Sequence, residues 1–350
     1  MGKVIFFLVA AALLFAAGSG YLALYPPVPQ DLGGVENLDG KADRFRIPVG
    51  QDDRLDAFLV QGKRAALIVI FHGYGRDHTR AWRYAQFLNR AGYAVLTVNF
   101  RSSRPWSRKP TTLGWYELND ARAVLDWVKA HPKLSKYSLG LFGESLGGSV
   151  ALVAASKHPE VRVVCVDAAF ATGERALADA SWRWAHLPPW PAAPLARVLG
   201  KTFTGHDPYE LDALTAARAI ANRPTFFITS QKDERFHEAQ SRDLWKAAGS
   251  DRDGLWILKG DIGHNESWIK NRAEYEKRVL AFYRRNLKGE PVEPFSQTAI
   301  DAARALEEAA AAAGRAVVGG AKAVGRAVTS GAKKAGEAVE DATSRNKGGK

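Results

Sequence analysis

The chain has 350 residues, enough for one large domain with appendages or for two domains. Its composition, 46% hydrophobic and 25% charged, is that of a globular protein. The net charge of +12 would suit nucleic acid, an anionic membrane surface or acidic substrates, but the basic residues are spread along the chain without a nucleic-acid-binding motif. We therefore expect no specific nucleic-acid partner. The single cysteine excludes intramolecular disulfides.

The first 25 residues are apolar after Lys3. At about 1.5 Å per residue, such a run can just cross a hydrocarbon core of about 30 Å. We expect residues 1–25 to form an uncleaved transmembrane signal anchor, with a signal peptide cleaved near residues 17–19 as the alternative. The positive-inside rule then places the catalytic domain outside the cytoplasm, either membrane-anchored or secreted into the periplasm or medium.

Strands and helices are expected to alternate after a Pro/Gly linker at residues 26–42. Strands are predicted at 44–48, 55–60, 65–71, 94–100, 137–142, 161–170, 225–230 and 255–258. Helices are predicted at 79–91, 115–130, 148–157, 236–248 and 268–287. This alternation predicts a mostly parallel, doubly wound α/β sheet in a domain at residues 43–290.

The alternation breaks between residues 171 and 223, where prolines cluster among three tryptophans. We expect this segment to form a helical cap over the sheet. The tryptophans either pack the cap onto the body or line an apolar substrate pocket. In the second case Trp182 and Trp184, together with Trp106 from an earlier loop, contact the substrate.

The sequence Gly143-Glu144-Ser145-Leu146-Gly147 lies between a short apolar run and a helix-compatible run. Strand, sharp turn and helix are the context of a nucleophile elbow, in which a serine hydroxyl is exposed above the sheet. The spacing therefore predicts Ser145 as a catalytic nucleophile. The N–H of Leu146, at the start of the helix, would face a developing oxyanion.

A serine needs a base and a third group that holds the base. Asp233 follows the strand at 225–230, and His264 follows the strand at 255–258. Both lie where the chain order of this elbow type requires the acid and the histidine. Glu234 and Asp167 are the alternative acids.

The loop His72-Gly73-Tyr74-Gly75 is expected to supply the second oxyanion donor, from the N–H of Tyr74 or alternatively of Gly73. Metal-ligand spacings and phosphate-binding glycine loops are absent from the sequence, so no metal or cofactor is expected.

These motifs together resemble the α/β-hydrolase superfamily over about residues 43–287. Within it the chain is most similar to hydrolases anchored by one N-terminal membrane span, which share the Gly263-His264-Asn265 motif. The resemblance implies cleavage of acyl esters, including lysophospholipids, while some peptidases share the same core. The chain departs from that group at residues 101–106, where a glycine-rich loop is usual.

The leading hypothesis is a serine hydrolase of carboxylic esters with an apolar acyl group. The alternatives are a serine peptidase or amidase on the same triad, a non-catalytic binding protein, or an interaction protein acting through its tail. That tail, residues 291–350, contains eleven-residue repeats that favour a disordered segment or a helix formed on an anionic membrane.

Overall fold

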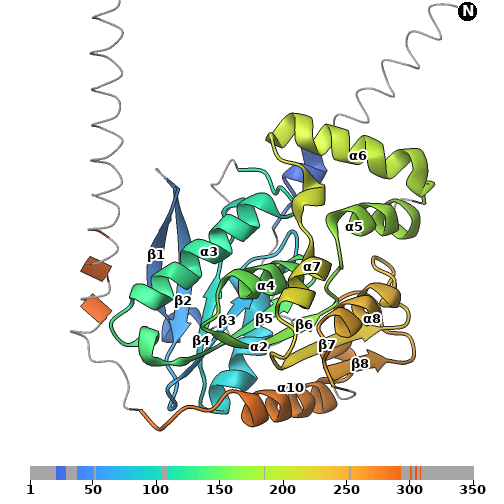
Figure 1. Cartoon of the computed structure of the whole chain (residues 1–350). Coiled ribbons are helices and arrows are strands. Elements are labelled where there is room, and N and C mark those ends of the chain that lie inside the picture. The colour runs from blue at the N-terminus through green and yellow to red at the C-terminus, as the bar shows by residue number, and fades with distance from the viewer. Residues whose placement is uncertain are drawn as a thin grey trace, which may run out of the picture.

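A computed structural model describes residues 21–28, 38–50, 53–103, 109–184, 186–251 and 254–292, with isolated positions at 300, 301, 304, 305 and 308. Its centre is an eight-stranded sheet with the order β1-β2-β4-β3-β5-β6-β7-β8 (Figure 1). The strands are β1 (Asp43–Val49), β2 (Asp53–Val60), β3 (Ala66–Phe71), β4 (Ala94–Val98), β5 (Ser138–Glu144), β6 (Val161–Asp167), β7 (Thr225–Ser230) and β8 (Leu255–Leu258). β2 pairs antiparallel with both β1 and β4, and the remaining pairs are parallel. The expected α/β-hydrolase fold class is confirmed.

The inner strands are apolar on both faces because helices cover both sides of the sheet. All six residues of β3 are buried. Successive side chains of a strand point to opposite faces. Accordingly, Leu67, Val69 and Phe71 enter one core, whereas Ile68 and Ile70 enter the other.

Helices α3, α4, α7 and α8 contribute to the first of these cores, and α2, α9 and α10 to the second (Figure 1). Their bounds are α2 (His78–Arg90), α3 (Trp115–Ala130), α4 (Leu146–Lys157), α7 (Ala213–Ala219), α8 (Glu238–Ala247), α9 (Ser267–Lys270) and α10 (Arg272–Asn286). One predicted helix, 268–287, is interrupted. Asn271 leaves the helical region, with φ −135° and ψ 37°, and separates α9 from α10.

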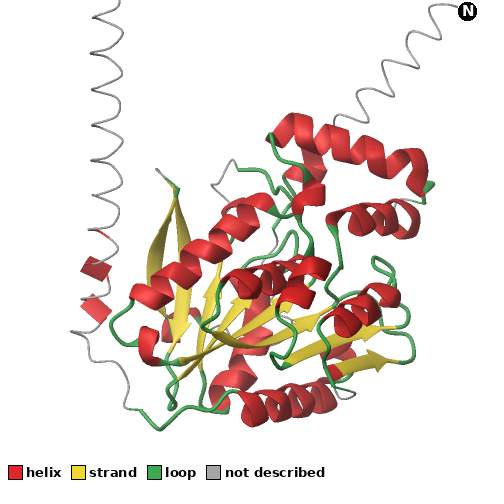
Figure 2. Ribbon diagram, viewed as in Figure 1, coloured by secondary structure: helices red, strands yellow, loops and turns green. Residues whose placement is uncertain are grey.

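The segment between β6 and β7 departs from the sheet and forms α5 (Gly173–Asp179), η4 (Ala180–Trp184), α6 (Pro189–Thr204) and η5 (Pro208–Glu210) before α7. Its two ends meet at a neck, where Thr172 pairs with Asp212 and the Gly173 N–H donates to the Leu211 carbonyl at 2.9 Å. α6 lies outermost, above α5 and away from the sheet (Figures 1 and 2). The exact limits of this cap and of the other expected domains stay predictions.

The prediction that residues 1–25 form a transmembrane helix and signal anchor is wrong. Every helix in the described part of the chain is too short or too polar to span a hydrocarbon core. Of the expected span, the structure describes residues 21–25, of which 21–24 are helical and Tyr21 and Leu22 are exposed. Residues 1–20 and the tail repeats lie outside the described residues. The location of the catalytic domain relative to the cytoplasm stays a prediction.

Candidate active site

Ser145 occupies the sharp turn between β5 and α4. Its backbone has φ 54° and ψ −120°, a left-handed φ that is costly for a residue with a Cβ. The Ser145 N–H donates to the Asp167 carbonyl at 2.7 Å, and the Ser145 carbonyl accepts from the Gly148 N–H at 2.9 Å. These bonds from both sides hold the strained turn in place.

The glycines on either side of Ser145 are required by close packing of backbone. A Cβ on Gly147 would overlap the carbonyl oxygens of Phe71 and His72 at the end of β3. A Cβ on Gly143 would overlap the carbonyl of Gly147. The first turn of α4 can therefore lie directly against β3 and β5 only because these two side chains are missing.

Ser145, His264 and Asp233 form a continuous chain of hydrogen bonds. Ser145 Oγ lies 2.9 Å from His264 Nε2, and His264 Nδ1 lies 2.7 Å from Asp233 Oδ2. An ionised carboxylate can only accept, so Nδ1 carries the proton and Nε2 is free to accept one from the serine. Both side chains of the His264–Asp233 pair are 2% exposed, which shields the bond from water. The arrangement can deprotonate Ser145 and stabilise the resulting imidazolium.

The two alternative acids have other partners. Glu234 Oε2 accepts the backbone N–H of His264 at 2.7 Å, so it orients the histidine loop rather than the ring. Asp167 accepts from the Tyr275 hydroxyl at 2.9 Å and from the Ser267 hydroxyl at 3.4 Å. Burial raises the pKa of Asp167 to about 7, and the charge of Glu144 adds to this shift.

The loop after β3 passes directly over Ser145. A Cβ on Gly73 would lie 3.3 Å from the Ser145 Cβ. His72 holds the loop, because its Nδ1 bonds the Gly73 carbonyl at 2.8 Å and its Nε2 accepts the Phe100 N–H at 3.2 Å. Within the described residues, neither the Tyr74 N–H nor the Leu146 N–H donates to another group. Both donors are thus available to an oxyanion.

A buried ion pair that sequence reasoning missed lies behind the elbow. Arg80 Nη2 is 2.9 Å from Glu144 Oε1, and the same nitrogen donates to the Asn265 carbonyl at 3.1 Å. Arg80 therefore links the residue before Ser145 to the residue after His264. Burial acts to raise the pKa of Glu144, but the Arg80 guanidinium, together with the charges of Arg83 and His264, outweighs burial and keeps that pKa below its usual range. Glu144, inside the elbow motif, was the sequence signal that could have indicated this ion pair, because a buried carboxylate needs a cation as partner.

The cap contacts the loop that carries Asp233. The Arg183 guanidinium, from η4, donates to the carbonyl of Asp233. Asp179, at the end of α5, accepts the His237 N–H and the Gln240 side-chain amide, each at 2.7 Å. These contacts place the η4 turn beside the hydrogen-bonded triad.

The expected substrate-contacting tryptophans are not gathered at the triad by the described structure. Trp182, on η4, is 60% exposed. Trp184 ends η4, but its side chain is outside the described part of the chain, as is the whole of Trp106. Their contact with substrate stays a prediction.

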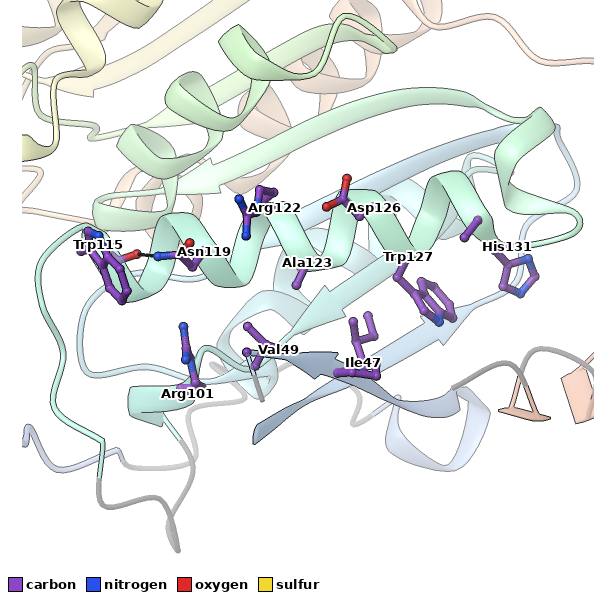
Figure 3. Close-up of a pocket in the computed structure, with 13 residues that line it drawn as sticks. Ile47, Val49, Arg101, Trp115, Asn119, Arg122, Ala123, Asp126, Trp127 and His131 are labelled. Carbon is purple, nitrogen blue, oxygen red and sulfur yellow. Dashed lines mark hydrogen bonds between the residues drawn. The ribbon is translucent and has the colours of Figure 1, made fainter. Parts of the chain in front are cut away.

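A groove of about 500 Å³ lies between β1 and α3, lined by Trp115, Arg122 and Trp127 among others (Figure 3). Four strand spacings of about 4.8 Å separate β1 from β5, so this groove is remote from Ser145. Trp115 at one end of the groove stacks on His206 of the cap, with ring centroids 3.7 Å apart. Among the described residues, no cluster of three or more His, Cys, Asp or Glu side chains could hold a metal ion.

The sheet, the strained serine and the hydrogen-bonded histidine and aspartate define a serine hydrolase of the α/β-hydrolase type. The sequence matches the X-Pro dipeptidyl-peptidase (S15) family over residues 59–272, and the chain belongs to that family. The superfamily expected from the sequence is confirmed, whereas the resemblance to its membrane-anchored subgroup has no support from this match.

Several relatives carry peptidase names. The chain is 25% identical to dipeptidyl aminopeptidase BIII of Pseudoxanthomonas mexicana, over 76% of this chain and 40% of that protein. It is 23% identical to dipeptidyl peptidase family member 6 of Caenorhabditis elegans, over 76% of this chain and 38% of that protein. It thus spans well under half of these two relatives. The uncharacterized protein YqkD of Bacillus subtilis is 27% identical over 61% of this chain and 70% of its own length.

Solved structures share the fold. The Pyrococcus furiosus esterase Pf2001 superposes with a TM-score of 0.59 at 21% identity, covering 75% of this chain and 98% of the esterase. The Pyrococcus horikoshii acylaminoacyl peptidase superposes with a TM-score of 0.55 at 19% identity, covering 74% of this chain and 43% of the peptidase. At these identities the likeness concerns the fold alone.

Proposed function

We propose that the chain hydrolyses carboxylic esters with an apolar acyl group, using Ser145 as nucleophile, His264 as general base and acid, and Asp233 as the group that orients His264. The observation that carries this proposal is the character of the cap stretch beside the triad, residues 180–184. This stretch, η4, contains one basic residue, Arg183, and no aspartate or glutamate, while Trp182 is exposed there. An uncharged, apolar acyl group suits these surroundings better than an ammonium group.

In the proposed reaction, His264 Nε2 takes the Ser145 hydroxyl proton as Oγ attacks the ester carbonyl carbon. The N–H groups of Tyr74 and Leu146 stabilise the oxyanion; one such donor is typically worth about 3 kcal/mol. His264 then protonates the leaving alkoxide, and the alcohol departs. Water, deprotonated by His264, attacks the acyl-enzyme, and the carboxylic acid is released as Ser145 regains its proton.

A dipeptidyl peptidase is the second candidate, favoured by the family and by two relatives' names. Removal of dipeptides from a free N-terminus needs a carboxylate to pair with the substrate ammonium group. Asp179, the last acid before the cap stretch, already accepts two hydrogen bonds. Glu234 likewise accepts the His264 N–H. Both acids thus hold neighbouring loops, and the assay below separates the ester reaction from the dipeptidase reaction.

The test compares p-nitrophenyl esters of increasing acyl length with an X-Pro p-nitroanilide, in wild type and Ser145→Ala. We expect turnover of esters that rises with acyl length and is lost in Ser145→Ala. The X-Pro anilide is offered with a free and with an acetylated amine. Cleavage of the free-amine form alone, at a kcat/KM above that of the esters, would replace the proposal with the dipeptidase function.

A further inference from the structure

The N-terminal segment, residues 21–28, lies against the oxyanion loop, residues 72–75. The Tyr74 hydroxyl donates to the Ala23 carbonyl at 2.7 Å, although the two residues are 51 positions apart. The segment begins with a helical turn, the blue turn drawn near α6 in Figure 1. A part of the chain that precedes the sheet therefore reaches the loop that passes over Ser145.

The N-terminal segment is itself held by the body of the protein. The Leu24 carbonyl accepts the Thr111 N–H at 2.8 Å. Thr111 is buried, and its hydroxyl donates at 2.7 Å to Oε1 of Glu117, in the first turn of α3. Within the segment, the Tyr25 N–H donates to the Tyr21 carbonyl at 2.8 Å, and the two rings stack. The segment therefore offers a fixed acceptor to the oxyanion loop.

The oxyanion loop has little rigidity of its own. Tyr74 lies between Gly73 and Gly75, and glycine permits more backbone conformations than any other residue. His72 holds the start of the loop through its ring. The N-terminal segment lies against the other end, because a Cβ on Gly75 would be 3.3 Å from the Pro26 Cβ. An oxyanion donor stabilises the transition state only if it is held in place while charge develops, so the loop needs support from both sides.

The Tyr74 side chain connects the oxyanion hole to the N-terminal segment. Its backbone N–H is one of the two available oxyanion donors, its ring packs against the first core, and its hydroxyl bonds the segment. Burial raises the pKa of Tyr74 to about 12, against the opposing charge of Arg235. The hydroxyl therefore keeps its proton, and remains a donor, at every pH at which His264 can act as a base.

We infer that residues 21–28 position the oxyanion hole, by holding Tyr74 so that its N–H stays aligned with Ser145. The holding contacts are the Ala23 carbonyl on the Tyr74 hydroxyl and the Pro26 ring on the loop backbone. The inference rests on the serine-hydrolase reaction proposed above. It applies to esters and peptides alike, because both react through a tetrahedral oxyanion.

The experiment removes these contacts one at a time in the full chain. Tyr74→Phe deletes the hydroxyl but keeps the ring and the N–H, and Pro26→Gly deletes the ring that meets the loop. Tyr283→Phe is the control for the first variant, because the Tyr283 hydroxyl also donates to a backbone carbonyl at 2.7 Å but lies in the second core. Pro27→Gly is the control for the second, since Pro27 approaches the loop through its carbonyl, which glycine retains.

The measurements are kcat and KM for a p-nitrophenyl ester and the rate at which a fluorophosphonate labels Ser145. The labelling rate also depends on the oxyanion hole, but not on a preference for esters or peptides. We expect Tyr74→Phe and Pro26→Gly each to lower kcat and the labelling rate about three- to tenfold at unchanged KM, less than outright loss of a donor would. Both controls should keep wild-type rates. Thermal melting checks that every variant is folded.

Wild-type kcat and labelling rates in both test variants would overturn the inference. A raised KM at unchanged kcat would do so as well, because the N-terminal segment would then contact the substrate instead. Faster turnover in the test variants would show that the segment obstructs the site, and an equal loss in the controls would indicate general destabilisation; either result contradicts a positioning role. A wild type that neither labels nor turns over the ester would overturn the proposed function, and this inference with it.

Discussion

The carboxylate of Glu144 lies 2.9 Å from the guanidinium of Arg80, and the two side chains are 1% and 6% exposed. A buried ion pair is costly to break from one side, since the remaining charge has no partner and no water. Here the pair also connects the serine turn to the histidine loop, because Arg80 bonds the Asn265 carbonyl.

Replacing Arg80 alone should therefore destabilise the fold and misplace His264. We expect Arg80→Met to cost about 3–5 kcal/mol in the free energy of unfolding. The double variant Arg80→Met with Glu144→Leu should cost less than Arg80→Met alone, because no charge remains buried. Urea unfolding of wild type, Arg80→Met, Glu144→Leu and the double variant checks this. A double variant whose cost equals the sum of the single costs would argue against coupling.

The triad assignment predicts strongly non-additive losses. Ser145→Ala and His264→Ala should each lower kcat by about 10⁴-fold or more, and the double variant should lose little further activity. Asp233→Asn should also lose most activity, since it disturbs the His264 tautomer. Steady-state ester hydrolysis measures these effects. Near-normal activity of Asp233→Asn, together with an inactive Asp167→Asn, would move the acid role to Asp167.

Asp167 should instead affect stability in a pH-dependent way. Its pKa is raised by burial to about 7 in the folded protein, against about 3.9 in an unfolded chain. Between these two pH values Asp167 is protonated in the folded protein and ionised in the unfolded chain. The free energy of unfolding of wild type therefore falls as pH rises from about 4 to about 7. Asp167→Asn cannot ionise, and it should gain up to about 4 kcal/mol on wild type across that window. Urea unfolding at several pH values tests this, and parallel curves for the two proteins would contradict it.

Two glycine substitutions form a matched pair. Gly147→Ala should destabilise the fold by at least about 2 kcal/mol and abolish activity, because the new Cβ overlaps the backbone at the end of β3. Gly200→Ala, in α6, meets nothing closer than 3.7 Å and should stabilise by about 0.5–1 kcal/mol. Thermal unfolding compares them. A mild effect of Gly147→Ala would mean that α4 can move away from β3 freely.

Arg183 of the cap bonds the carbonyl of Asp233, and this contact predicts that Arg183 positions the catalytic acid. Arg183→Met should lower kcat about tenfold with little change in KM, because Asp233 and His264 lose a support without losing substrate contacts. Arg197→Met removes an equally long cation that bonds Asp207 instead, and its kcat should be normal. Equal kcat values for the two variants would exclude such a role.

The sheet was predictable because parallel strands covered on both sides are continuous apolar runs, as in Ala66–Phe71. All eight predicted strands are present. Ser145, Asp233 and His264 were found from a local motif and from the order in which such residues follow their strands. The structure places these three within hydrogen-bonding distance.

Other features have no local signature. Arg80 and Glu144 are 64 positions apart, and the fold alone brings them together. The helix break at Asn271 is one backbone conformation inside a stretch with helical periodicity. Residues 1–25 were predicted to span a membrane because they form a long apolar run. Hydropathy alone does not distinguish an apolar segment that enters a membrane from one that packs against protein.

The neck at Thr172 and Asp212 has an evolutionary consequence. The chain leaves and re-enters the body at a single point, so the inserted part can change length without displacing β6 or β7. Loop closure becomes costlier only slowly as a loop grows, which makes such exchanges thermodynamically cheap. Natural variants of this architecture can therefore keep an unchanged reaction centre while the outer part of the excursion, residues 186–211, diverges rapidly, and new substrate preferences can arise by replacement of that one segment.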